Sequence, residues 1–251
     1  MALGHVARTF ARVAGATAGV AAGAALTAGI VRRLGAAGGA SGPRLRRSDL
    51  PDWVLPTDVL ASYDEADEQR GVSDELGLPL VLDEVDAWAA LGAVAALERL
   101  VDDGTRSSVV LDLGARRSAL SRWSRARGFR VVREAPPERG AVDLVTRLHP
   151  DGAVAGDVDA VLELAATVLR PGGAVVVTVP VGGLEAPGAM GRADLRALEA
   201  RAHDLGLVLV GDLDGEVGRR LAAAVQGACD DEGRRAEGSA FALARLTLRR
   251  R

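Results

Sequence analysis

The sequence predicts an α/β fold built on a largely parallel sheet, and residues 156–183 are the main reason. Behind Asp157, a residue type that caps helices, apolar side chains recur on one helical stripe: Val158, Val161, Leu162, Ala165 and Leu169. Pro171 and the two glycines after it end this helix, and residues 174–179 form an almost entirely apolar run. A strand that is apolar on both faces is typical of a parallel sheet with helices on either side. Ligands bind such sheets at the carboxyl ends of the strands, so we expect the functional site there.

Other segments have the composition of strands, and the sequence predicts a sheet of six. Together with residues 174–179 these segments are 109–113, 129–133, 142–146, 207–210 and 241–248. Helices are expected at 85–101, 118–127 and 194–205, each followed closely by a glycine. The last strand is expected to return as an antiparallel strand at the edge.

Composition and charge fit a globular enzyme and exclude several classes of protein. The 251 residues are enough for one α/β domain of ordinary size with an extension. All 31 basic residues are arginine and the net charge is −3, so no overall field indicates a nucleic-acid partner. Cys229 is the only cysteine, which excludes an internal disulfide and a cysteine-based zinc cluster. His5, His149 and His203 are too scattered to predict a metal site.

Residues 1–48 form a basic segment rich in alanine and glycine. They contain seven arginines and no acid, and Val13 to Val31 runs for 19 residues without a charge. This run is a candidate membrane anchor, and the arginines after it would place the larger domain in the cytoplasm, at the inner face of the membrane. A secretory signal, an organellar presequence and a disordered low-complexity tail have similar composition and remain alternatives.

The charge reverses after this segment. From Asp52 to Asp86 the sequence has eleven acids against Arg70 alone. We interpret residues 49–79 as a solvated acidic linker, although such a stretch could also bind the basic segment or a protein partner. The ordered domain is expected to begin near Leu80 and to extend over residues 80–251.

Three short motifs resemble class I S-adenosylmethionine-dependent methyltransferases. They are residues 109–114 (VVLDLG), 143–146 (DLVT) and 169–173 (LRPGG). The resemblance implies a Rossmann-like methyltransferase sheet and S-adenosylmethionine as cofactor. In that family the first strand ends in D-x-G-x-G-x-G, where the backbone approaches the cofactor closely. Here Asp112 and Gly114 match and are candidate cofactor-binding residues, but Arg116 and Ser118 stand where the next two glycines would be.

The resemblance implies a further acid after the second strand, which holds the ribose hydroxyls of the cofactor. Glu134 is the nearest candidate, about one position early, and a solvated glutamate at a strand end is the alternative. Between Glu134 and Val142 there is no room for the family's third strand and its helix. This is why six strands are expected rather than seven.

The fourth strand of such a fold is where the resemblance places catalysis. His149 follows that strand here and is a candidate general base, since an acceptor hydroxyl or amine reacts better once its proton has left. The alternative is a loop histidine that is hydrogen-bonded to backbone.

Three functions remain open, in this order of preference. The first is a methyltransferase that acts on a small-molecule, lipid or envelope-sugar acceptor. The second is a catalytically inactive module with the methyltransferase fold that binds or assembles with a protein partner. The third is a nucleotide- or phosphate-binding protein that uses Arg116 and Arg117 at a helix N-terminus.

Overall fold

The computed structural model describes most of the chain after residue 48. The described ranges are 49–60, 62–114, 118–153, 157–182, 189–213, 215, 217–220, 222 and 242–251. Val13 to Val31, Arg116, Arg117 and Cys229 lie outside them. No helix of the described part has the length and apolar character needed to cross a membrane.

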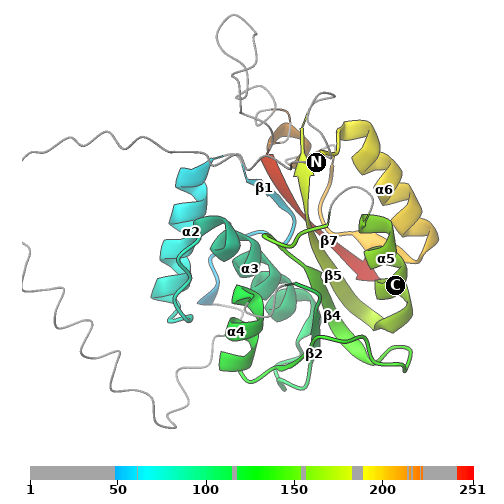
Figure 1. Cartoon of the computed structure of the whole chain (residues 1–251), viewed down its shortest axis with the longest axis horizontal. Coiled ribbons are helices and arrows are strands. Elements are labelled where there is room, and N and C mark those ends of the chain that lie inside the picture. The colour runs from blue at the N-terminus through cyan, green and yellow to red at the C-terminus, as the bar shows by residue number, and fades with distance from the viewer. Residues whose placement is uncertain are drawn as a thin grey trace, which may run out of the picture. The chain divides into compact units, whose positions relative to one another are not determined.

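The described residues form one seven-stranded sheet (Figure 1). Its strands are β1 (Asp58–Leu60), β2 (Val109–Asp112), β3 (Arg130–Val132), β4 (Val142–Arg147), β5 (Leu169–Val181), β6 (Leu207–Leu209) and β7 (Ala242–Arg250). The order is β1-β7-β5-β4-β2-β3, and β6 also pairs with β7. β3, β2, β4 and β5 are parallel, whereas β7 runs antiparallel to β5. The sheet and its helices confirm the predicted Rossmann-like α/β fold.

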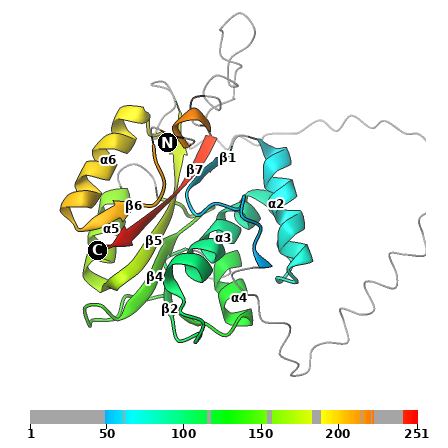
Figure 2. The ribbon, with the colours of Figure 1, turned by 180° about the vertical axis from the view of Figure 1, so that it is seen from behind.

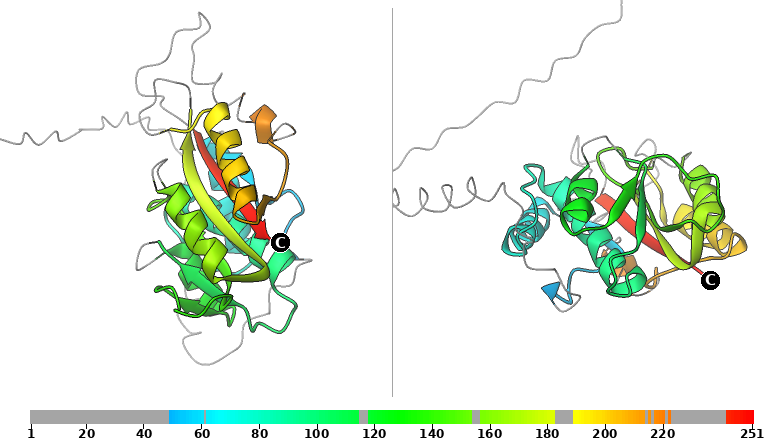
Figure 3. Two further views of the ribbon diagram at one scale, coloured as in Figure 1. Left: turned by 90° about the vertical axis from the view of Figure 1, so that its right-hand side faces the viewer. Right: turned by 90° about the horizontal axis from the view of Figure 1, so that it is seen from below.

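Helices cover both faces of the sheet (Figures 2 and 3). They are α2 (Tyr63–Glu75), α3 (Glu84–Ala96), which continues into a π-helical turn (Leu97–Val101), α4 (Ala119–Ala126), α5 (Val158–Val168) and α6 (Arg192–Asp204). Val110, Leu144 and Val176 face the core beneath α3 and α4, and their neighbours Leu111, Val145 and Val175 face the core beneath α5 and α6. This alternation is the period of two expected of a strand that is buried on both faces.

All six expected strands are present, and no strand occurs between β3 and β4, where residues 133–141 are described throughout. β5 begins earlier than expected, at Leu169 rather than at residue 174. The proline-glycine turn lies within this strand, where the pairing with β4 shifts register. Gly172 has a φ of +80°, and a Cβ on Gly173 would lie 2.8 Å from the carbonyl oxygen of Asp143. Gly172 and Gly173 therefore permit a bulge within β5, whereas the sequence had predicted that they end the preceding helix.

Two predictions that concern residues 49–79 are wrong: the segment is not a solvated linker, and it adds a strand to the six that were expected. This segment contributes β1, the seventh strand, and α2, which packs on α3. Leu50, Val54 and Val59 are at most 2% exposed. β1 pairs with residues 243–245 of β7, beside β6 on the same edge of that strand.

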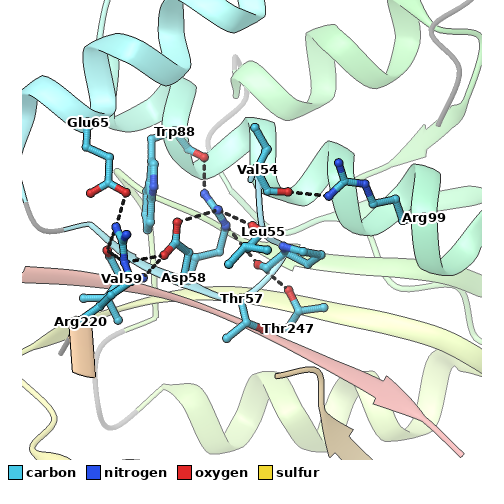
Figure 4. Close-up of polar contacts among 12 residues, drawn as sticks. Val54, Leu55, Thr57, Asp58, Val59, Glu65, Trp88, Arg99, Arg220 and Thr247 are labelled. Carbon is cyan, nitrogen blue, oxygen red and sulfur yellow. Dashed lines mark hydrogen bonds and ion pairs between the residues drawn. The ribbon is translucent and has the colours of Figure 1, made fainter. Parts of the chain in front are cut away.

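Residues 50–59, which we call the strap, are held by three arginines from distant parts of the chain (Figure 4). Arg99 donates hydrogen bonds to the carbonyl oxygens of Leu50, Pro51 and Val54 at 2.7 to 3.0 Å. Arg245 donates to those of Leu55 and Pro56 at 2.6 and 3.1 Å, and to that of Trp88 in α3. Arg220 donates to Val59 at 2.9 Å.

The guanidinium of Arg245 is fully buried, and burial lowers its pKa to about 10, so it stays charged at neutral pH. Besides these carbonyl oxygens, Oδ2 of Asp58 lies 3.8 Å from Nη2 of Arg245, and the centroid of the Trp88 ring lies 4.2 Å from its Cζ. Burial also raises the pKa of Asp58, against the lowering influence of Arg245 and Arg220. The arginine thus tethers the strap, β7 and α3 to one another.

Gly92 provides the space for this guanidinium, because a Cβ there would lie 1.9 Å from Cζ of Arg245. We expect Gly92→Ala to lower the free energy of unfolding by about 3 kcal/mol or more, since the buried cation would lose its partners. Denaturant unfolding measures this. Gly71→Ala in α2 is the matched control, because no atom lies within 4 Å of its Cβ, and it should leave stability unchanged or raise it slightly. Equal effects of the two substitutions would contradict the tether.

The strap is also part of the folded unit that contains the sheet. A chain that begins at residue 49 should unfold in one cooperative thermal transition. A chain that begins at Leu80 should show none, because Arg245 would lose Leu55, Pro56 and Asp58. Circular dichroism during heating distinguishes the two, and a transition of the shorter chain at the same temperature would refute the expectation.

Candidate functional site

The carboxyl ends of β3, β2 and β4 lie side by side and bring the four candidate site residues to one edge of the sheet. Glu134 follows β3, Asp112 and Gly114 stand at the end of β2, and His149 follows β4. In parallel sheets this edge is where ligands bind.

Asp112 is 1% exposed, and its carboxylate accepts four hydrogen bonds within the chain. The donors are the backbone N–H of Gly114 at 3.0 Å, the hydroxyl of Thr146 at 3.3 Å, and the hydroxyls of Ser118 and Ser121. Ser118 also caps α4 by accepting from the N–H of Ser121. Asp112 therefore joins β2, β4 and the start of α4, which is a positioning role and leaves its carboxylate no exposed oxygen for a ligand.

Gly114 is tightly enclosed by this network. A Cβ there would lie 3.2 Å from Oδ1 of Asp112 and 3.9 Å from Cβ of Ser118. Its carbonyl oxygen accepts a hydrogen bond from Nη1 of Arg133 at 3.0 Å. Residues 115–117 lie outside the described ranges.

Two arginines flank the end of β2, and sequence reasoning missed both. Arg133, just beyond β3, also donates to the hydroxyl of Ser121 at 3.3 Å. Arg147, the last residue of β4, donates from Nη1 to the carbonyl oxygen of Leu113 at 3.1 Å. Both side chains are half-buried, and we call them the arginine pair.

Glu134 and His149 are the two candidates whose side chains can reach a ligand. The carboxylate of Glu134 is exposed and makes no hydrogen bond or ion pair with another described residue. His149 is half-buried, and burial lowers its pKa below the ordinary value, against the raising influence of Asp83 and Asp151. Its imidazole is neutral at pH 7 and can accept a proton.

Three carboxylates form what we call the acidic rim: Asp83 and Asp151, which act on His149, and Asp86, which interacts with both of them. Asp83 caps α3, and its side chain accepts from the backbone N–H of Asp86 at 2.8 Å. Burial raises the pKa of Asp86 to about 6, with smaller raising contributions from Asp83, Asp112 and Asp151, while Arg122 opposes them. No group of three or more His, Cys, Asp or Glu side chains in the described ranges is arranged to hold a metal ion.

Some of these residues carry a local sequence signal. Ser118 with Ser121, and Asp83 with Asp86, have the spacing of an N-cap residue and the third residue of the helix that it caps. The arginine pair has no such signal in a chain whose basic residues are all arginine.

No protein-family model matches the chain, and no curated protein matches it. Similar solved structures exist at low identity. A putative sarcosine dimethylglycine methyltransferase from Galdieria sulphuraria is 15% identical, with a TM-score of 0.42, over 75% of this chain and 98% of that one.

Two further structures are similar to the same degree. Geranyl diphosphate C-methyltransferase from Streptomyces coelicolor A3(2), in complex with Mg²⁺, geranyl diphosphate and S-adenosyl-L-homocysteine, is 12% identical with a TM-score of 0.40, covering 70% of this chain and 87% of that one. The [4+2]-cyclase SpnF is 17% identical with a TM-score of 0.40, covering 77% and 97%. At identities of 12–17% the likenesses concern the fold alone, and the reaction has to be argued from the residues of this chain.

The raised pKa of Asp86 has a consequence for stability. Because its pKa in the folded state lies above the ordinary 3.8, the folded chain holds this proton more tightly, so the free energy of unfolding falls as pH rises from about 4 to about 6. Asp86→Asn should remove that fall and stabilise the chain at pH 8 by about 1 to 2 kcal/mol, which is the effect of a pKa near 6 discounted for partial exposure. Denaturant midpoints of both chains across pH 4 to 8 test this. If the denaturant midpoints of the two chains changed with pH in the same way, the pKa of Asp86 would not be raised by folding.

Proposed function

We propose that this chain is an S-adenosylmethionine-dependent methyltransferase that acts on a small molecule. The observation that carries the proposal is the meeting of three features at one sheet edge: the exposed carboxylate of Glu134, the neutral imidazole of His149 and the acidic rim. Each suits one part of the chemistry: Glu134 and His149 follow the carboxyl ends of β3 and β4, and the acidic rim includes the start of α3.

The residues fit the cofactor in charge and in hydrogen bonding. S-adenosylmethionine carries a sulfonium and an ammonium cation, and the mutual repulsion of Asp83, Asp86 and Asp151 would be relieved by a cation. Glu134 would hold the two ribose hydroxyls with its carboxylate oxygens, which no other described residue engages. Asp112 would act indirectly by fixing Gly114 and the start of α4.

The cofactor, when bound, supplies an electrophilic methyl group. His149 would accept the proton of the acceptor hydroxyl or amine, and its lowered pKa keeps the imidazole in the accepting form at neutral pH. Asp83 and Asp151 would stabilise the imidazolium that results, because both favour the charged form. Hydrogen bonds from Arg133 and Arg147 to the carbonyls of Gly114 and Leu113 would keep the end of β2 in place during this transfer.

A catalytically inactive module that binds a partner is the second candidate, and a specific observation favours it. The carboxylate of Asp112 and the carbonyl of Gly114 are both engaged by the chain's own donors, so part of the edge is already filled. Among the described residues no strand lies between β3 and β4, so the site lacks the element that would line one of its sides.

Calorimetric titration of the full chain with S-adenosylmethionine and with S-adenosylhomocysteine distinguishes the two. An enzyme should bind both, and an excess of about a hundredfold over Kd should stabilise the fold by about 2.7 kcal/mol. Glu134→Gln should weaken binding about tenfold, a loss of about 1.4 kcal/mol. His149→Gln should leave it unchanged because that side chain serves the acceptor.

Glu138→Gln is the matched control, since Glu138 is exposed on the same connection as Glu134. Absence of heat and of stabilisation with either compound would favour the inactive module. If Glu134→Gln and Glu138→Gln weakened binding equally, Glu134 would not belong to the site.

A further inference from the structure

One buried nitrogen of the arginine pair has no hydrogen-bond partner among the described residues. Nε of Arg147 is buried and makes no hydrogen bond, although Nη1 of the same guanidinium donates to Leu113. An unpaired donor on a buried charged group is costly, and in native proteins such a donor commonly faces a ligand, an ion or a water. Arg147 is the only charged residue among the described side chains that bury an unpartnered nitrogen or oxygen.

The direct hydrogen-bond acceptors of the arginine pair are also all neutral groups. Arg133 and Arg147 bond only to neutral acceptors, the carbonyls of Gly114 and Leu113 and the hydroxyl of Ser121, and neither forms an ion pair with a described residue. Other arginines of the fold differ, since Arg170 pairs with Asp143 and Arg220 with Asp58. Asp112 reaches Arg133 only through Ser121 and already accepts four hydrogen bonds.

The position of the pair suits an anion. The two guanidinium groups bond to consecutive carbonyls of one strand end, Arg133 from the side of β3 and Arg147 from the side of β4. α4 begins just beyond, so the positive end of its dipole adds to the same region. Planar guanidinium forks match the oxygens of phosphate groups.

We propose that Arg133 and Arg147 form a phosphate-binding site at the end of β2, which holds the phosphate group of a small phosphorylated acceptor. Arg147 stands two residues before His149, so a molecule anchored by its phosphate at the pair would present its remaining part to the imidazole. This assignment to the acceptor rests on the proposed methyl transfer. The phosphate site itself rests on the arginine pair alone.

The test is a calorimetric titration of the full chain with inorganic pyrophosphate at constant ionic strength. We expect saturable binding, weakened at least tenfold by Arg133→Met and by Arg147→Met, because each removes charge-assisted hydrogen bonds. Arg130→Met is the matched control, since Arg130 is exposed at the opposite end of β3 and loses the same charge. Should a methionine variant fail to fold, Arg133→Lys and Arg147→Lys keep the charge, and we expect them to weaken binding severalfold because lysine lacks the fork.

Each outcome decides the proposal. Absence of saturable binding, or an equal loss in Arg130→Met, overturns the site. Displacement of pyrophosphate by S-adenosylhomocysteine would assign the pair to the cofactor carboxylate and overturn the acceptor assignment, whereas simultaneous binding supports it. Failure of the proposed function is a separate result, because a chain that binds pyrophosphate but not S-adenosylmethionine keeps the site and loses the transferase.

Discussion

The buried guanidinium of Arg245 is the constraint on which the remaining structure depends. A charge without solvent contact is tolerated only when every surrounding group is in place, and here β7 carries the arginine while its partners come from the strap and from α3. Because α3 runs from the acidic rim at its N-terminus to Gly92 beside this charge, the tether also fixes where Asp83 and Asp86 lie relative to the sheet. The geometry of the site is thus set partly by the core.

A second, smaller network has the same role at the strand ends. Asp112 stands opposite Thr146 in the register of β2 and β4, and its four hydrogen bonds join both strands to α4. Residues that can meet a ligand, Glu134 and His149, lie in the connections on either side of this rigid centre. A buried carboxylate that fixes the strand ends, with more exposed side chains on either side, suits a binding site at a sheet edge.

The sequence predicted the sheet well because its strands are buried on both faces and its helices end at glycines, both of which are local signals. The strap escaped prediction because its acids resemble a solvated linker, whereas the partners of Asp58 are Arg220 and Arg245, which lie more than a hundred residues away. Its apolar positions Leu50, Val54 and Val59 were the available signal, and the charge run concealed it. The same limit applies to the site: Asp112 and Gly114 stood out by motif, but which donors engage them depends on tertiary contacts of Ser118, Ser121 and Arg133.

Among the described residues the acidic rim and the arginine pair form no ion pair with each other, which favours a candidate binding site over a structural ion-pair network at this edge. Neither arginine of the pair forms an ion pair with a described carboxylate, and Asp112 contacts Arg133 only through the hydroxyl of Ser121. The acids instead raise the pKa of Asp86, and Arg147 keeps a buried donor without a partner. Both are costs to the empty fold that a cation on one side and an anion on the other would remove. These two costs are the physical reason to assign a binding role to this edge.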